Sequence, residues 1–240
     1  MASATAICLY MVPQLQAAIL TDTPEPLLTS GGLDRVSAGL FYQQLRRTIE
    51  TETGFEMEIQ ARAYEAVLGL DVMPWLTLYG SAGAADARFK DSDFGQDRFA
   101  WTAGFNMNIW QWTGYGEVPV WRLNFKTRAE MARYETETGN LDIEWTDYSV
   151  AFPIGYEVLF SRSPESFDDL DHLELFLGPA LSYIDGRYKQ GGQSYDFEEN
   201  TSLGVMGGIS LFITKTLFIE GSASYFDGFL IRGGIGYSFE

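Results

Sequence analysis

The side chains of this sequence that could do chemistry are mainly carboxylates and guanidiniums at alternate positions of apolar segments. Arg122, Lys126, Arg128 and Glu130 alternate with apolar or small residues. A period of two places such side chains on one face of a β-strand. Facing strands can then pair opposite charges, or line a polar path where space remains between them. The predicted charged-face residues are Glu56, Glu58, Arg62, Arg122, Lys126, Arg128, Glu130, Asp147, Glu157, Glu174, Glu220 and Arg232.

Catalytic and metal-binding patterns are weak. The chain has one histidine, His172, at the end of an acidic turn over residues 168–172. A nucleophile paired with this histidine has no supporting pattern, so we expect no enzyme activity. Residues 168–172 and 91–97 carry carboxylates that bind divalent cations elsewhere, but the second lacks the glycine at position six of a calcium loop. We therefore expect solvated loops, no metal site and no cofactor.

Composition excludes several classes of protein. The 240 residues carry a net charge of −17, which argues against nucleic acid as a partner, because its phosphates would be repelled. The single cysteine, Cys8, cannot form an internal disulfide. The sequence has no apolar run of about 18 residues, so it predicts no spanning helix. A membrane protein of this composition would have to be a closed β-barrel, since only such a barrel satisfies the backbone without helices.

From Val36 onward, the pattern predicts about ten antiparallel strands separated by turns. Between Arg62 and Tyr64 the apolar residues change from odd to even positions, which predicts a β-bulge. Residues 86–98 and 186–196 are predicted to be outer loops. The expected strands cover residues 36–43, 55–70, 76–85, 99–109, 121–131, 147–158, 173–183, 202–211, 217–225 and 229–239.

The last of these segments has an apolar face that ends in aromatic residues. Ile235, Tyr237 and Phe239 share that face, and Glu240 follows them. This stretch resembles the C-terminal strand of bacterial outer-membrane β-barrels, which the barrel assembly machinery reads as an insertion signal. Glu240 departs from the family pattern, in which the aromatic residue is usually the last.

The resemblance extends over nearly all of the chain after Val36. Aromatic residues stand near the ends of several apolar rows, as in the interfacial belts of membrane proteins. The middles of these rows carry no charged residue, and a charge facing lipid there would cost about 2–4 kcal/mol. The predicted fold is all-β, a closed antiparallel transmembrane barrel of about ten strands. The resemblance implies that both termini are periplasmic.

The sequence also indicates how the chain is divided. Residues 1–18 contain an apolar stretch and end in Gln16, Ala17 and Ala18, which predicts a signal segment, although no Lys or Arg precedes the stretch. Residues 19–33 form a linker that contains prolines and glycines. Residues 34–240 form the barrel domain.

The predicted function is that of an outer-membrane protein with a structural or surface-interaction role and a charged, largely filled lumen. Hairpin register would place Arg46 and Arg47 beside Glu56 and Glu58. One alternative is a narrow polar pore for small solutes or ions. Another is a soluble barrel whose apolar rows line a lipid- or ligand-binding cavity. The expected partners are outer-membrane lipid, the barrel assembly machinery and an unidentified extracellular ligand.

A second predicted ion pair joins the consecutive expected strands over residues 121–131 and 147–158. The expected register places Arg128 near Asp147 inside the barrel. In a narrow and poorly hydrated lumen, such charges should pair and form hydrogen bonds.

Overall fold

The computed structural model describes residues 36–52, 54–73, 75–89, 96–114, 120–138, 141–159, 172–199, 201–213 and 216–239. The predicted signal segment and linker lie outside these ranges. Among the described residues, no helix is long and apolar enough to cross a membrane. The strands are β1 (Val36–Thr51), β2 (Glu56–Met73), β3 (Leu76–Phe89), β4 (Arg98–Gly114), β5 (Val120–Thr138), β6 (Leu141–Ala151), β7 (Ile154–Leu159), β8 (His172–Gln190), β9 (Gln193–Glu199), β10 (Leu203–Phe212), β11 (Leu217–Tyr225) and β12 (Phe229–Phe239).

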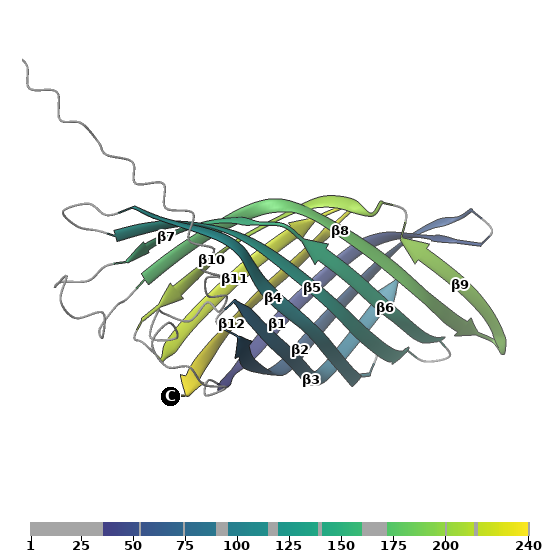
Figure 1. Cartoon of the computed structure of the whole chain (residues 1–240). Coiled ribbons are helices and arrows are strands. Elements are labelled where there is room, and N and C mark those ends of the chain that lie inside the picture. The colour runs from purple at the N-terminus through teal and green to yellow at the C-terminus, as the bar shows by residue number, and fades with distance from the viewer. Residues whose placement is uncertain are drawn as a thin grey trace, which may run out of the picture.

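These strands form one closed antiparallel barrel (Figure 1). The first strand pairs with the last, from Val36 opposite Phe239 to Arg46 opposite Phe229. Strands β6 and β7 both pair with β5 and β8, while β9 and β10 both pair with β8. Each of these two pairs therefore makes one interrupted crossing, and the described barrel has ten crossings, as predicted. Closure leaves no sheet edge along the paired stretch of β1 and β12.

The two ends of the barrel differ. We call the end that carries Val36 and Phe239 the terminal end, and the opposite end the far end. The β8–β9 hairpin projects beyond the rest of the barrel at the far end (Figure 1). Its turn is Gly191–Gly192, with φ values of 60° and 85°, which suit a tight hairpin turn. The predicted loop at 186–196 is therefore wrong, because β8 and β9 remain paired down to Gln190 and Gln193.

An apolar belt surrounds the outer wall. Leu40, Leu68, Leu177 and Leu203 face outward in this belt, and Leu177 is 64% exposed. A row of large apolar side chains on the outside is unstable in water and stable in hydrocarbon. The belt also contradicts the alternative of a soluble barrel, which would need these residues to line an internal cavity.

Aromatic side chains border the belt on both sides. Toward the terminal end, the ring of Trp121 contacts those of Trp112 and Tyr156, with centroid separations of 4.9 and 6.2 Å. On the other side, Tyr148 stacks on Tyr183. Tyr148 and Tyr156 are eight residues apart, which corresponds to about 20 Å along the membrane normal at a strand tilt of about 40°. This spacing is close to the thickness of the apolar band in outer-membrane barrels.

Beyond the second aromatic row, the wall reverses its polarity. The outer face now carries partly exposed ion pairs, including Arg46 with Glu58 at 2.6 Å and Arg133 with Glu144 at 2.7 Å. The inner face carries a packed set of apolar side chains, which we call the inner apolar cluster. Its buried members are Leu45, Ile49, Ile59, Ala61, Ala63, Ala85, Ala87, Ala100, Ala132, Tyr134, Ile143, Trp145, Ile184 and Phe197.

This reversal corrects the prediction for β2. The pairing of β1 with β2 is continuous from Val36–Leu70 to Glu50–Glu56, so there is no bulge between Arg62 and Tyr64. The apolar residues move from one face of β2 to the other because the outer surroundings of the wall change along the strand. The strand itself stays regular. The three charged residues predicted to face inward on this strand face outward instead: Glu56, Glu58 and Arg62.

The belt predicts a position-dependent effect of charge on β8. Leu177→Arg places a guanidinium in the middle of the belt and should cost about 2–4 kcal/mol of membrane stability. The matched control is Asp185→Arg, which lies on the same outward face beyond the aromatic row. We expect L177R to lose most of its heat-modifiable, membrane-embedded fraction on unboiled gels, and D185R to keep it. Equal assembly of the two variants would contradict the placement of the belt.

Candidate functional site in the barrel lumen

The charged residues that remain inside the barrel are organised around one ion pair. Arg232 on β12 donates two hydrogen bonds to the Glu130 carboxylate on β5, at 2.7 and 2.8 Å. Arg232 also donates to Oε1 of Gln43 on β1. The bidentate geometry is the strongest arrangement available to a guanidinium and a carboxylate. Because β5 and β12 are not neighbours in the sheet, this pair crosses the lumen.

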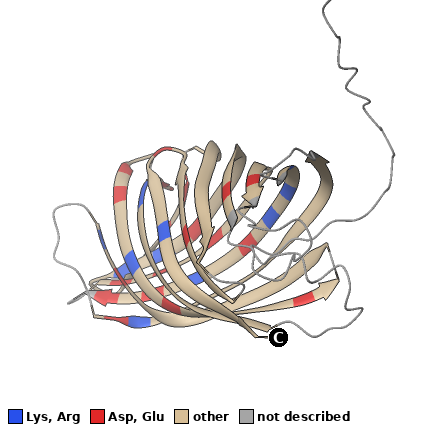
Figure 2. Ribbon diagram, turned by 90° about the vertical axis from the view of Figure 1, so that its left-hand side faces the viewer, with Lys and Arg blue, Asp and Glu red and all other residues tan. Residues whose placement is uncertain are grey.

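A second guanidinium, that of Arg128, joins the network from β5, the strand that also carries Glu130. Arg128 lies 3.6 Å from the Glu130 carboxylate and 3.4 Å from that of Glu220 on β11. Its Nε donates to the hydroxyl oxygen of Tyr79, which donates in turn to Glu130 at 2.8 Å. Figure 2 shows acidic and basic residues close together on neighbouring strands. Each charge in this part of the lumen is therefore held by partners from several strands.

Glu65 on β2 has a different environment. The residue is 5% exposed, and its carboxylate accepts hydrogen bonds from Ser81 Oγ at 2.8 Å and from Gln43 Nε2 at 3.4 Å. Both donors are neutral, and within the described residues Glu65 makes no ion pair shorter than 4.0 Å. Gln43 also donates to Tyr134, which stacks on Trp145 in the inner apolar cluster. The polar network and the cluster are thus in direct contact.

Two further ion pairs lie on the other side of the lumen, toward the terminal end. Lys126 on β5 contacts Glu174 on β8 at 2.6 Å. Arg122 lies 3.7 Å from Glu157 on β7. The Glu174 carboxylate occupies the space beside Gly155, where a Cβ atom would lie 2.2 Å from its Oε1. A glycine at this position is what allows the carboxylate to reach Lys126.

Another buried group lies toward the far end. Arg47 is 1% exposed and donates to Glu199 at 2.7 Å, and its guanidinium lies over the ring of Phe226. Ser182 donates to Glu199 at 2.8 Å and lies 3.3 Å from Asp147. A charge buried this deeply is stable only with such hydrogen bonds. This group joins β1, β8 and β9 at the height where the barrel leaves the belt.

Most of the predicted charged set comes together in the lumen. Its members there are Arg122, Lys126, Arg128, Glu130, Asp147, Glu157, Glu174, Glu220 and Arg232.

Two predicted pairings differ from the structure. Arg46 does pair with Glu58, but on the outer face, where the charges are partly solvated. Arg128 contacts Glu220, and Asp147 contacts Ser182, so the predicted Arg128–Asp147 pair is wrong. Arg128 and Asp147 do not meet because of the strand register, which places Arg128 opposite Ala151 and Asp147 opposite Ala132.

Sequence analysis missed several lumen residues. Glu65 lies between Tyr64 and Ala66 of the outward apolar row, so its inward face follows from the alternation, but it is not among the predicted charged-face residues. Glu199 lies at the end of β9, between the predicted loop at 186–196 and the predicted strand at 202–211. The polar residues that complete the network are Gln43, Tyr79, Ser81, Tyr134 and Ser182.

The contacts of this site are ion pairs and hydrogen bonds that support the wall from inside. Among the described residues, no three His, Cys, Asp or Glu side chains come together in a way that could hold a metal ion. His172 begins β8 at the terminal end. The residues of the assembly-signal prediction, Ile235, Tyr237 and Phe239, face outward on β12. Their role in assembly stays a prediction.

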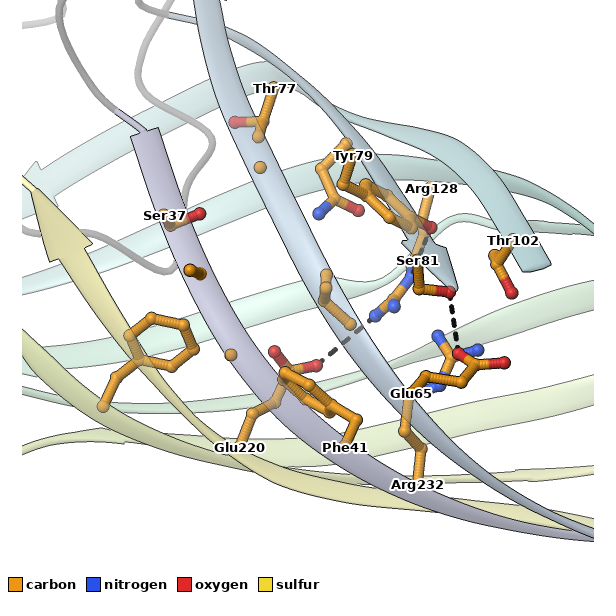
Figure 3. Close-up of a pocket in the computed structure, with 16 residues that line it drawn as sticks. Ser37, Phe41, Glu65, Thr77, Tyr79, Ser81, Thr102, Arg128, Glu220 and Arg232 are labelled. Carbon is orange, nitrogen blue, oxygen red and sulfur yellow. Dashed lines mark hydrogen bonds and ion pairs between the residues drawn. The ribbon is translucent and has the colours of Figure 1, made fainter. Parts of the chain in front are cut away.

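The lumen contains a cavity of about 90 Å³ on the terminal side of the Arg232–Glu130 pair (Figure 3). We call it the inner chamber. It extends from Ser37 and Thr77, near the strand ends, to Arg128 and Arg232. Ala63 lies two residues from Glu65 on β2, on the side toward the far end, and belongs to the inner apolar cluster. The chamber is therefore closed toward the far end.

Comparison with known proteins gives a general likeness of fold. No family model and no curated protein matches the chain. Among solved structures, the outer membrane protease OmpT from Escherichia coli is similar with 12% identity and a TM-score of 0.43, covering 88% of this chain and 98% of that one. The attachment invasion locus protein Ail of Yersinia pestis has 14% identity and a TM-score of 0.37, covering 87% and 100%. The translocator domain of autotransporter NalP from Neisseria meningitidis has 12% identity and a TM-score of 0.35, covering 89% and 90%.

The central ion pair predicts a large penalty for removing one partner. Glu130→Ala leaves two guanidiniums in the lumen without their shared carboxylate, and should destabilise the barrel by about 3–5 kcal/mol. Glu58→Ala removes one partner of an exposed pair and should cost about 1 kcal/mol or less. Urea unfolding of the two variants in lipid vesicles measures both values. A similar loss in the two variants would contradict the central role of Glu130.

Proposed function

We propose that this protein is an outer-membrane β-barrel with a closed lumen and a structural or surface-interaction role. The observation that carries the proposal is the filling of the lumen. Ion pairs occupy its terminal side, and the inner apolar cluster occupies its far end. The apolar belt and its two aromatic rows support the location, because such a wall matches a bilayer in thickness and polarity.

The far end supports a role at the cell surface. There the wall continues beyond the belt, and the β8–β9 hairpin projects further still (Figure 1). A hollow of about 330 Å³ lies on this wall between β5, β6 and β8, with charges of both signs around it. Its lining includes Arg98, Asp142, Glu144, Arg187 and Lys189. A hydrated surface of mixed charge suits contact with a polar partner outside the membrane.

We also propose the orientation that the outer-membrane resemblance implies. The terminal end would face the periplasm, and the far end would face the outside. The barrel assembly machinery would then act on Ile235, Tyr237 and Phe239, which lie near the periplasmic edge of the belt. A narrow pore remains the second candidate, because the inner chamber leaves space on the terminal side.

A closed lumen predicts no ionic current. Reconstituted wild-type barrel should give no single-channel steps in a planar bilayer, whereas a sixteen-stranded porin under the same conditions conducts. Replacing both Tyr134 and Trp145 with Ala opens a gap in the inner apolar cluster and tests whether the assay detects leakage through this chain. Stepwise currents from the correctly folded wild type would refute the closed-lumen proposal.

The orientation predicts which end a reagent can reach in intact cells. With Cys8 replaced by Ser, Gln190→Cys at the β8–β9 hairpin should react with a membrane-impermeant maleimide. Met73→Cys, at the terminal end of β2, should react only after the outer membrane is opened. Reaction of M73C but not Q190C in intact cells would reverse the proposed orientation.

A further inference from the structure

The inner chamber combines a buried carboxylate with an unfilled space. The cavity of about 90 Å³ is large enough for several waters or one small molecule. Figure 3 shows Glu65, Ser81 and Thr102 at one side of its inner part, with Arg232 beside Glu65 and the Arg128–Glu220 pair further away. Charge, hydrogen bonding and shape each indicate what such a molecule would be.

The network around the chamber has a surplus of negative charge. Glu130 and Glu220 are matched by the two guanidiniums of Arg128 and Arg232. Glu65 then accepts hydrogen bonds from neutral donors, and the guanidinium of Arg232, already paired with Glu130, is the main cation that acts on it. Adding the neighbouring Lys126–Glu174 pair does not change this balance, because it contributes one charge of each sign. A carboxylate buried in this way is stabilised by taking up a cation.

Hydroxyl groups beside Glu65 add hydrogen-bonding capacity. The Thr102 side chain is 3% exposed, and its hydroxyl lies beside the Glu65 carboxylate, to which it can donate its proton while its lone pairs stay available to accept. Ser81 Oγ donates its proton to Glu65 and keeps lone pairs free to accept. The two hydroxyls and the carboxylate therefore line one side of the chamber, and each has lone pairs that can accept a hydrogen bond. A primary ammonium has three N–H donors, which matches this set.

The rest of the chamber suits a short apolar tail. Phe41, Val67 and Phe218 line it between the acceptors and the terminal end. Both rings occupy space beside glycines: a Cβ at Gly234 would be 2.4 Å from the Phe41 ring, and one at Gly236 would be 2.2 Å from the Phe218 ring. The glycines thus create the narrow apolar passage. A bare metal ion would leave this passage unused.

We propose that the inner chamber is a binding site for a small primary ammonium compound. Its ammonium group donates to Glu65, Thr102 and Ser81, and its alkyl chain lies between Phe41, Val67 and Phe218. The compound enters from the terminal end and stops at the Arg232–Glu130 pair. This site goes beyond the proposed surface role, and binding in detergent solution can fail or succeed independently of conductance and orientation.

Isothermal titration of the detergent-solubilised full chain with n-butylammonium chloride tests the proposal. We expect saturable one-to-one binding with a Kd in about the millimolar range, as suits a ligand of about five heavy atoms. Glu65→Gln keeps the shape but removes the surplus charge, and should weaken binding by about tenfold or more. Thr102→Val removes one acceptor and should weaken binding by about three- to tenfold. Glu58→Gln on the outer face is the matched control and should leave binding unchanged.

Two further probes, one without a charge and one without an alkyl chain, decide the ligand class. n-Butanol lacks the charge, and ammonium chloride lacks the tail, so both should bind more weakly than n-butylammonium. Absence of saturable wild-type binding, equal binding of either probe, or unchanged binding by E65Q would overturn the proposal. If E65Q does not fold, as judged by heat modifiability, T102V decides by the same criterion.

Discussion

The surroundings of the barrel wall change along each strand, and this change controls where every side chain can be stable. At the height of the belt the outside is hydrocarbon, so Leu40 and Leu177 face outward and charged groups are confined to the lumen. Beyond the second aromatic row the outside is water. There Arg46 and Glu58 pair on the outer face, while Ile59 packs inside. A regular strand such as β2 runs through both the belt and the water-exposed part of the wall. Its side chains alternate throughout, but the apolar face is outward in the belt and inward beyond it.

The lumen follows from the same constraint. Charges that cannot face lipid must find partners inside, where little water is available to solvate them. Arg232 and Glu130 satisfy each other across the barrel, and Arg128 and Tyr79 complete the arrangement from neighbouring strands. These contacts join strands that are far apart in the sheet. The lumen side chains therefore hold the wall together as well as filling the interior.

The lumen is incompletely filled in one place, and the proposed binding site lies there. On the terminal side of the central ion pair, glycines beneath Phe41 and Phe218 keep a passage open, and Glu65 faces it with hydrogen bonds from the neutral donors Ser81 and Gln43. A barrel of the proposed kind, closed to ions, can thus still offer a site for a small molecule. The closed end and the open end have different chemistry because one is an apolar cluster and the other is a polar chamber.

The sequence by itself determined the all-β class, the number of crossings, the outward belt and most of the charged lumen set, because a period of two is a local property of each strand. It could not determine which face of β2 is buried near Glu58 and Arg62, since polarity there depends on whether lipid or water lies outside. It also could not pair Arg128 with Glu220, or Arg232 with Glu130. Those contacts cross the lumen, and only closure of the barrel sets which side chains meet, because curvature brings together residues that share no hairpin.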